Sequence, residues 1–304
     1  MLILMMYHNP VLLSKCIEGL NINPNGIYVD VTFGGGGHSK EILKNLTGGK
    51  LFAFDTDSDV ISNVPIDKKF KLISSNYKNL KRFLRVEGVR KVDGILADLG
   101  VSSHQFDVPE RGFSFRFDAD LDMRMNTSAN TKALDIINTY SKDDLSNIFF
   151  QYGEIRQSRK VADLIVKARQ INEIKTTFNL VTIIEVLVPK IRRNKFLSQV
   201  FQSLRIEVNQ EIESLKIMLN DGIDLLKIDG RFVVLSYHSI EDRLVKNLFK
   251  RGSFSGEVQK DFFGNVKNKM KEINRKVIIA SQEELKVNTR SRSAKLRVAK
   301  RIEC

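Results

Sequence analysis

The sequence predicts an α/β fold: a core with a mainly parallel sheet, interrupted by an all-helical insertion. Short, nearly continuous apolar segments recur through the first hundred residues, with helix-like stretches between them, as in sheets covered by helices on both faces. This alternation stops, gives way to a long helical region, and then resumes. The chain of 304 residues is long enough for one large domain or two modest ones. We therefore expect a core formed by residues 1–106 and 205–304, and an insertion formed by residues 107–204.

Four strands are expected in the first part of the core, because each segment is rich in β-branched or aromatic residues and is followed by turn or polar residues. They are Ile27–Phe33, Leu51–Phe54, Phe70–Ser74 and Val92–Asp98. In the insertion, apolar residues at the spacing i, i+3, i+4 and i+7 predict two amphipathic helices. One carries Val161, Leu164, Ile165 and Ala168, and the other carries Ile183, Ile184, Leu187 and Val188 and stops at Pro189.

The core pattern then resumes with a helix and three strands. The apolar face of the helix comprises Val208, Ile212, Leu215, Leu219 and Leu226. A turn at Asp229-Gly230 leads into a buried strand that ends near residue 238. Two final strands are expected over residues 275–281 and 294–301.

The net charge of the chain is +13, and most of it lies near the C-terminus. From residue 231 onward there are 18 lysines and arginines against 8 aspartates and glutamates, which gives a net charge of +10. Such a surface attracts a polyanion, although a solvated face or a compositional bias toward lysine would also produce it. If that polyanion is a nucleic acid, the best candidate for contacts with its phosphates is the cluster Arg290, Arg292, Lys295 and Arg297.

The remaining composition favours a cytoplasmic protein without a membrane anchor. No apolar run approaches the ~20 residues that a membrane helix needs. The opening stretch "MLILMMYHNP" lacks a basic flank and a cleavage site, so we do not expect a signal peptide. Cys16 and Cys304 are too few and too far apart for a disulfide framework or a zinc site, so no metal is expected.

The stretch "YVDVTFGGGGHSKEIL", from Tyr28 to Leu43, places four glycines between a strand and a helix. Glycine permits a positive φ and lets the main chain approach a ligand closely. A dinucleotide fingerprint would need its third glycine at Lys40 or Ser39, and a Walker loop would need G-K-[ST]. Both patterns fail, which leaves another nucleoside cofactor or a plain tight turn.

Acidic residues follow the expected strands at their carboxyl ends. Asp55 stands about twenty residues after the glycines. In doubly wound folds, a carboxylate at this position accepts hydrogen bonds from the hydroxyls of an adenosine ribose. Asp98 ends the fourth strand, where it could accept a hydrogen bond from an amine or favour a nearby sulfonium cation. Asp30 could bond the amides of the glycine loop, cap the helix or face the ligand. Solvated strand-end or turn carboxylates remain the alternative for Asp55 and Asp98.

Several blocks of sequence together resemble one enzyme family. The blocks include "GIYVDVTFGGGGHSKEIL", "DGILADLGVSSHQFD", "LDMRMN", "LRIEVNQEI", "SYHSIEDR" and "RSRSAKLRVAKR", and they span nearly the whole chain. In this order the chain is similar to the bacterial 16S ribosomal RNA cytosine N4-methyltransferases, which depend on S-adenosylmethionine (SAM). The resemblance implies a Rossmann-like methyltransferase core with a helical insertion that recognises RNA. It also implies a substrate cytidine in the decoding region of 16S rRNA, either as free rRNA or within a small ribosomal subunit or its precursor.

The resemblance also implies roles for individual residues. The residues expected at the cofactor are Gly36, Gly37, His38, Asp55, Tyr77, Asp98 and Gln105. Within this set Asp55 would hold the ribose, Tyr77 would pack by the adenine, and Asp98 and Gln105 would lie near the methionine end. Tyr77 taken alone would be a partly buried aromatic at a strand end. Asp98 is the candidate catalytic residue, as the acceptor of an N–H from the target amine, or else it only positions the cofactor.

A few positions depart from the family pattern. Gly35 stands where a basic residue is common, His104 replaces a proline, and Tyr237 replaces a phenylalanine. His238 is expected either to form structural hydrogen bonds or to contact substrate. Glu241 and Asp242 fit the first turn of a helix, where acids are favourable.

Three other functions compete with this interpretation. An NAD-dependent oxidoreductase disagrees with the missing third glycine and the basic C-terminal region. A non-catalytic RNA-binding protein would need no glycine loop with carboxylates beside it. A SAM-dependent methyltransferase acting on another nucleic acid or on protein has the same residue pattern, apart from the resemblance. The sequence is compatible with a monomer or a homodimer.

Overall fold

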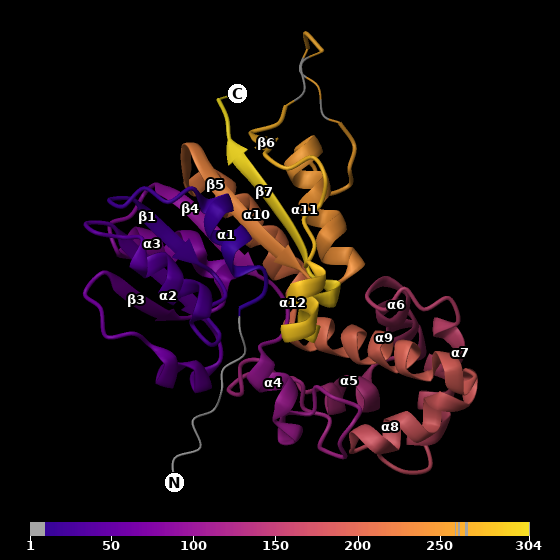
Figure 1. The fold of residues 1–304 in the computed structure, drawn as a ribbon. Helices are drawn as coiled ribbons and strands as arrows, with labels where there is room; N and C mark the ends of the chain where they lie inside the picture. Colours follow the sequence, from indigo (N-terminus) through magenta and orange to yellow (C-terminus); the bar gives the residue numbers. More distant parts are fainter. Residues whose placement is uncertain (1–9, 259, 261, 265–266, 304) are drawn as a thin grey trace. The chain divides into compact units, whose positions relative to one another are not determined.

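The computed structural model describes residues 10–258, 260, 262–264 and 267–303 (Figure 1). The stretch examined for a signal peptide, apart from Pro10, and Cys304 therefore lie outside the described residues. The chain divides into two compact units, one of Met1–Gly100 with Ile212–Cys304 and the other of Val101–Glu211. The borders expected at residues 106 and 204 would cut through the helices α4 (Ser103–Asp107) and α9 (Lys190–Asn209). The observed borders, after Gly100 and after Glu211, leave both of these helices intact.

The first unit contains a seven-stranded sheet with the order β3-β2-β1-β4-β5-β7-β6. Its strands are β1 (Ile27–Asp30), β2 (Lys50–Asp55), β3 (Phe70–Ser74), β4 (Val92–Asp98), β5 (Leu226–Ser236), β6 (Met270–Glu272) and β7 (Lys295–Arg301). Strands β1 to β5 are parallel to one another, whereas β7 is antiparallel to both β5 and β6. The predicted α/β fold with a mainly parallel sheet is confirmed.

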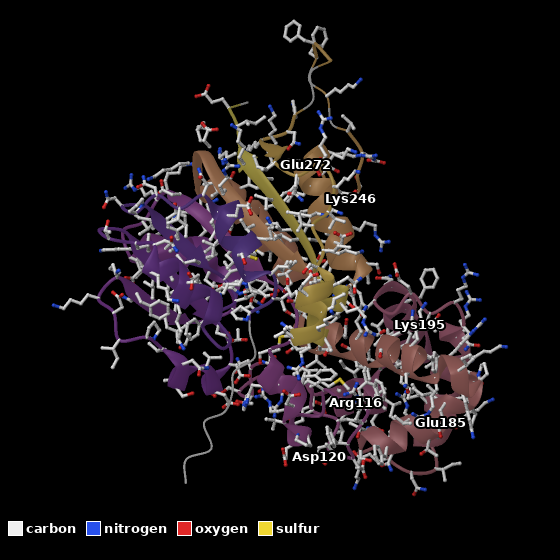
Figure 2. All side chains as sticks on the ribbon, viewed as in Figure 1. Arg116, Asp120, Glu185, Lys195, Lys246 and Glu272 are labelled. Carbon is white, nitrogen blue, oxygen red and sulfur yellow. The ribbon has the colours of Figure 1, made fainter. Side chains whose placement is uncertain are left out.

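Helices cover both faces of this sheet. The helices of this unit are α1 (Leu13–Leu20), α2 (Gly37–Lys44), α3 (Leu80–Val86), α10 (Glu211–Leu225), α11 (Ser239–Arg251) and α12 (Gln282–Val287). Alternate strand residues point to opposite faces, so that Val29 joins a core with α3, α10 and α11 while Tyr28 joins a core with α1 and α2. Exposed charges such as Lys246 project outward from this unit (Figure 2).

Three expectations for the second part of the core are wrong. Residues 275–281 form no strand; only Ile278 bridges to Leu296. The side chain of Asn274 accounts for this, because its amide bonds Val298 and Leu296 of β7 where backbone pairing would continue. In addition, Leu226 begins β5 and does not extend the preceding helix. Asp229 has a φ of 61°, so the turn expected at Asp229-Gly230 is an irregularity within a longer strand.

The second unit is helical and has its own core. Its helices are α4, α5 (Ala133–Thr139), α6 (Lys142–Gln151), α7 (Ser158–Arg169), α8 (Thr177–Ile184) and α9. The first amphipathic pattern lies in α7, as predicted. The second is shorter than expected, because α8 ends at Ile184 and a 3-10 turn, Glu185–Leu187, precedes Pro189. Pro189 caps α9, where its missing N–H has no cost.

Among the described residues, no helix has both the length and the apolar character needed to cross a membrane.

Candidate active site

The candidate site lies at the carboxyl ends of β1, β2 and β4 in the first unit. From β1 the chain adds β2 and β3 on one side, and from β4 it adds β5 on the other side. The crevice at the carboxyl ends of β1 and β4 is therefore the topological switch point of the sheet. Each of the three strands ends in an aspartate, namely Asp30, Asp55 and Asp98. In open α/β sheets ligands bind at this edge, so the three carboxylates stand where a cofactor is expected.

The glycine loop is held to the strand ends by hydrogen bonds. The backbone N–H of Gly34 donates to Asp55 Oδ2 at 2.8 Å, and the N–H of Phe33 donates to the carbonyl of Phe54 at 2.9 Å. Gly36 has a φ of +73°, and a Cβ there would lie 2.9 Å from the ring of Phe33. Both the backbone conformation and the space therefore require glycine at this position.

Asp30 fastens the first turn of α2 to the end of β1. Its Oδ1 accepts the backbone N–H of Thr32 at 3.1 Å, and its Oδ2 accepts the Ser39 hydroxyl at 2.7 Å. The side chain is buried, and burial raises the pKa of Asp30 to about 6. Of the alternatives left open by the sequence, these contacts favour a structural role in the loop.

Asp98 is held from three directions. The hydroxyl of Tyr237 donates to its Oδ1 at 2.7 Å, and Nδ1 of His38 lies 3.7 Å from its Oδ2. Its backbone N–H donates to Thr32 Oγ1 at 2.6 Å. Burial raises the pKa of Asp98, although His38 and the Tyr237 hydroxyl act in the opposite direction. The side chain nevertheless keeps 24% of its surface exposed, so a ligand can reach this carboxylate.

His38 stands in the first turn of α2 and is almost buried. Its Nε2 lies 3.1 Å from the carbonyl of Val11, which leaves Nδ1 facing Asp98. Since the imidazole is engaged on both sides, any cofactor contact of His38 is best made by its backbone N–H. No side chain caps α2 among the described residues, so the N–H groups of its first turn remain available to an anion.

Asp55 and Tyr77 lie at the ends of neighbouring strands. Asp55 Oδ1 accepts the backbone N–H of Asp57 at 2.9 Å, in addition to the bond from Gly34 to Oδ2. A carboxylate oxygen has two lone pairs, so Asp55 can still accept hydrogen bonds from a diol. Burial raises its pKa. Tyr77 begins the 3-10 turn after β3, and its half-buried ring packs against the core of the unit.

Comparison with known proteins identifies the family. The model of the MraW methylase family matches residues 5–302. The chain belongs to the MraW methylase family. Relatives named ribosomal RNA small subunit methyltransferase H include one from Flavobacterium johnsoniae, 54% identical and covering 98% of this chain and 99% of the relative. Another, from Parabacteroides distasonis, is 53% identical over 97% of this chain and 98% of the relative. The chain is therefore a SAM-dependent methyltransferase.

The residues at the strand ends of the methylase fit SAM. Gly36 leaves space that a Cβ would fill, and the uncapped start of α2 supplies N–H donors that suit the carboxylate of the cofactor. Asp55 supplies acceptors that suit ribose hydroxyls. Asp98 supplies negative charge that suits a sulfonium. Gly36, Gly37, His38, Asp55 and Asp98 are thus gathered on one edge of the sheet.

Gln105 of the methylase belongs to the second unit. It lies in α4, where its N–H donates to Ser102 Oγ at 3.2 Å and its Oε1 accepts the N–H of Ser102 at 3.1 Å. This reciprocal pair is a capping box, and Gln105 is buried. The observed contacts therefore give Gln105 a role in the start of α4.

The four basic residues near the C-terminus of the methylase differ in their surroundings. Arg297 of β7 is buried, and its Nε lies 2.7 Å from Asp242 Oδ1. The same carboxylate lies 3.4 Å from Nζ of Lys295. A phosphate contact does not fit Arg297, because its guanidinium is engaged by Asp242 inside the unit. Arg292 is exposed, and Arg290 is half-buried in the same 3-10 turn, Thr289–Ser293.

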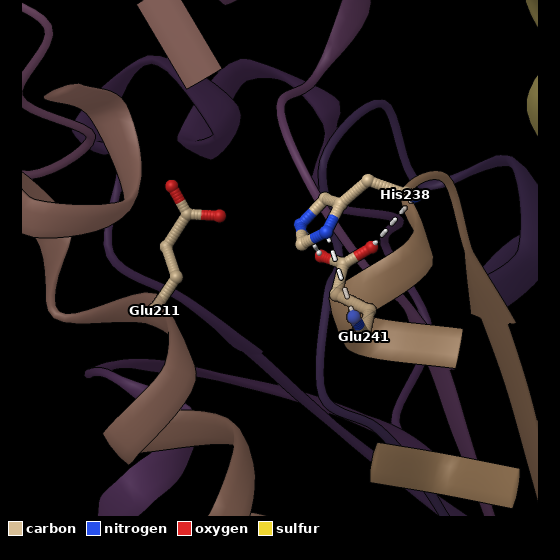
Figure 3. Close-up of side chains that lie close together, drawn as sticks. All are labelled: Glu211, His238 and Glu241. Carbon is tan, nitrogen blue, oxygen red and sulfur yellow. Dashed lines mark hydrogen bonds and ion pairs between the residues drawn. The ribbon is translucent and has the colours of Figure 1, made fainter. Parts of the chain in front are cut away.

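His238 of the methylase forms structural contacts at the start of α11 (Figure 3). Its Nδ1 accepts the backbone N–H of Glu241, and its Nε2 lies 3.1 Å from Glu241 Oε1. Glu241 Oε2 in turn accepts the backbone N–H of Tyr237 at 3.0 Å. Of the two roles expected for His238, these contacts favour the structural one.

The sequence did not point to three partners that shape the site, namely Thr32, Ser39 and Tyr237. Thr32 and Asp98 are 66 residues apart, but β1 and β4 pair with Asp30 opposite Leu96. Two residues further along each strand, this register brings Thr32 beside Asp98. The strand pairing could have predicted that contact, whereas the contact of the Tyr237 hydroxyl with Asp98 required the conformation of the loop after β5.

Proposed function

We propose that this methyltransferase transfers a methyl group to the N4 amine of a cytidine in the decoding region of 16S rRNA. The names of its relatives support small-subunit rRNA as the substrate. The structural observation that carries the chemistry is the partly exposed carboxylate of Asp98, which ends β4 beside the glycine loop. A ribosomal substrate also agrees with a cytoplasmic location and with the basic C-terminal region.

The proposed cofactor contacts follow the chemistry of each strand end. Asp55 accepts hydrogen bonds from the ribose hydroxyls, and Tyr77 packs against the adenine. The glycine loop, through Gly36, Gly37 and the backbone N–H of His38, approaches the amino-acid portion. Asp98 faces the methionine end. SAM supplies a methyl group on a sulfonium, which is the electrophile of the reaction.

Asp98 is the proposed catalytic residue. The cytosine N4 amine is a weak nucleophile, because its lone pair is delocalised into the ring. A carboxylate that accepts one N–H orients this amine and accepts that proton as the new bond to nitrogen forms. Burial raises the pKa of Asp98 and so makes its carboxylate a stronger base than an exposed aspartate. Correct alignment of the reacting groups can contribute as much as ~7–11 kcal/mol.

The proposed RNA contacts involve both units. The helical unit recognises RNA around the target, and Arg290, Arg292 and Lys295 contact phosphates. Arg297 is removed from this group because Asp242 engages it. The target cytidine must be unpaired or turned out of its helix, since its N4 amine has to reach the cofactor.

The experiment that tests this function is mass analysis of rRNA nucleosides from cells in which the gene is deleted and then restored. We expect N4-methylated cytidine at one position of 16S rRNA to disappear and return. Methylation lost from a different nucleic acid would favour the alternative of another substrate. No change in any nucleic acid, together with RNA binding by the purified protein, would favour a non-catalytic RNA-binding protein.

A further inference from the structure

Tyr237 is the one hydroxyl group that contacts the carboxylate of Asp98 among the described residues, at 2.7 Å from Oδ1. Leu235 pairs with Asp98 in the parallel ladder of β4 and β5, so Tyr237 follows just beyond the end of β5. Its backbone N–H donates to Glu241 Oε2 at 3.0 Å, which fixes the residue at the start of α11. The ring is thus held at its base while its hydroxyl reaches the neighbouring strand end.

Other titratable groups surround this pair from each adjoining element. His38 of α2 faces Oδ2 of Asp98, and its proximity favours the ionised carboxylate. Glu241 of α11 opposes that ionisation, and Asp30 of β1 and Cys16 of α1 are close enough to interact with Asp98 electrostatically. The carboxylate therefore sits among other acids, and Tyr237 provides its direct hydroxyl donor.

The phenol is suited to act as a permanent donor. Burial and the adjacent Asp98 raise the pKa of Tyr237 well above its ordinary value, so the hydroxyl keeps its proton at any working pH. A phenol that stays protonated donates a hydrogen bond that stabilises the ionised carboxylate, and it adds no second negative charge beside it.

Resting on the proposed function of Asp98, we propose that the Tyr237 hydroxyl is a positioning group that keeps this carboxylate ionised and in a single orientation. Tyr237 acts through Asp98 and does not touch the reacting atoms. The proposal makes a phenol at the end of β5 part of the machinery that prepares the methyl acceptor.

The test compares Tyr237→Phe with Tyr28→Phe in the full chain. The hydroxyl of Tyr28 accepts the N–H of Asn23 at 2.6 Å, so Tyr28→Phe also removes a tyrosine hydroxyl from the same unit but leaves Asp98 alone. The Cγ of Asp98, in protein labelled with ¹³C-aspartate and assigned by Asp98→Asn, is followed by NMR through a pH titration. Single-turnover rates with saturating SAM are measured over the same pH range.

We expect Asp98 to titrate at a higher pH in Tyr237→Phe than in the wild type or in Tyr28→Phe. The acid limb of the rate profile should move in the same direction. At neutral pH the rate should fall about tenfold or more, as for the loss of one hydrogen bond to a charged group, and recover toward the wild-type value as pH rises. An unchanged titration of Asp98 in Tyr237→Phe would overturn the proposal.

The NMR titration needs no RNA, so the two proposals can fail separately. If Asp98→Asn keeps full turnover while Tyr237→Phe still shifts the titration of Asp98, the proposed catalytic role fails and the coupling between the two residues stands. If Asp98→Asn is inactive but Tyr237→Phe shifts neither the titration nor the acid limb, the coupling fails and the catalytic role stands.

Discussion

Asp98 combines a raised pKa with a surface that a ligand can reach, and this combination is what a general base needs. Asp98→Asn preserves the shape of the side chain and removes its charge. We expect turnover to fall by about 10²–10⁴-fold, the range typical of losing a general base, while the protein stays folded. Single-turnover rates at saturating SAM measure this, with SAM affinity from calorimetry. Normal turnover under these conditions would show that Asp98 only positions the cofactor.

Asp30 gives the folded state a pH dependence. Because its pKa is raised from 3.8 to about 6, the folded state binds its proton more tightly than the unfolded state. The stability that this proton provides is complete below pH ~4 and is lost as pH rises through ~6, by roughly 3 kcal/mol. Denaturant unfolding between pH 4 and pH 7 should show this decline.

Asp30→Asn cannot ionise, and its amide still bonds Ser39 or Thr32. In this variant the free energy of unfolding should therefore fall less between pH 4 and pH 7 than in the wild type. Some fall should remain, because the pKa values of Asp55 and Asp98 are also raised. The same pH dependence in wild type and Asp30→Asn would mean that Asp30 does not titrate in this range.

At the scale of elements, the glycine loop can be tested with two glycines that share a backbone conformation. Gly36 and Gly88 both have a φ of +73°, but a Cβ at Gly36 would meet the ring of Phe33, whereas a Cβ at Gly88 would meet nothing within 4 Å. Replacing either glycine by alanine should cost about 1–2 kcal/mol of stability from backbone strain. Only Gly36→Ala should also weaken SAM binding, because the loop must shift away from Phe33.

The measurement for this pair is SAM affinity by calorimetry beside the midpoint of denaturant unfolding. Equal SAM affinity in Gly36→Ala and Gly88→Ala would contradict the assignment of the loop to the cofactor.

The strands of the core were predictable because each is a short apolar run with turn residues after it. The segment over residues 275–281 is also a short apolar run. It forms no strand, because the side chain of Asn274 makes hydrogen bonds to the backbone of β7 that strand pairing would otherwise make. Such a substitution of side chain for backbone depends on tertiary position and leaves no periodic signal. The end of α8 at Ile184 was missed for a related reason, since a 3-10 turn keeps similar apolar spacing.

At the candidate site, the sequence located the carboxylates but not how they are held. The aspartates that end β1, β2 and β4 follow from strand ends and the glycine turn. The pairing of Arg297 with Asp242 could not be foreseen, because these residues lie 55 positions apart and a basic cluster gives no sign of which member faces inward. A basic stretch of sequence can therefore predict a polyanionic partner without predicting which of its side chains contact that partner.

At the scale of the whole molecule, the excess of positive charge predicts salt-dependent RNA binding. Arg292 is exposed, so Arg292→Ala should reduce the slope of log affinity against log salt by about 1. Lys71→Ala is a matched control. Arg292 lies just before β7, whereas Lys71 lies in β3, at the edge of the sheet farthest from β7 and β6. Its slope should equal that of the wild type. Fluorescence anisotropy with a labelled fragment of 16S rRNA supplies both slopes, and equal slopes for all three proteins would exclude Arg292 from the interface.

Family membership establishes methyl transfer, and we infer the position of the cofactor from the residues at the carboxyl ends of β1, β2 and β4. The most direct test is a crystal structure of the full chain with S-adenosylhomocysteine. We predict that the ribose hydroxyls contact Asp55, that the amino-acid portion lies against the glycine loop, and that the sulfur lies beside Asp98. Binding at any other place, with the edge formed by β1, β2 and β4 filled by protein side chains, would contradict the account.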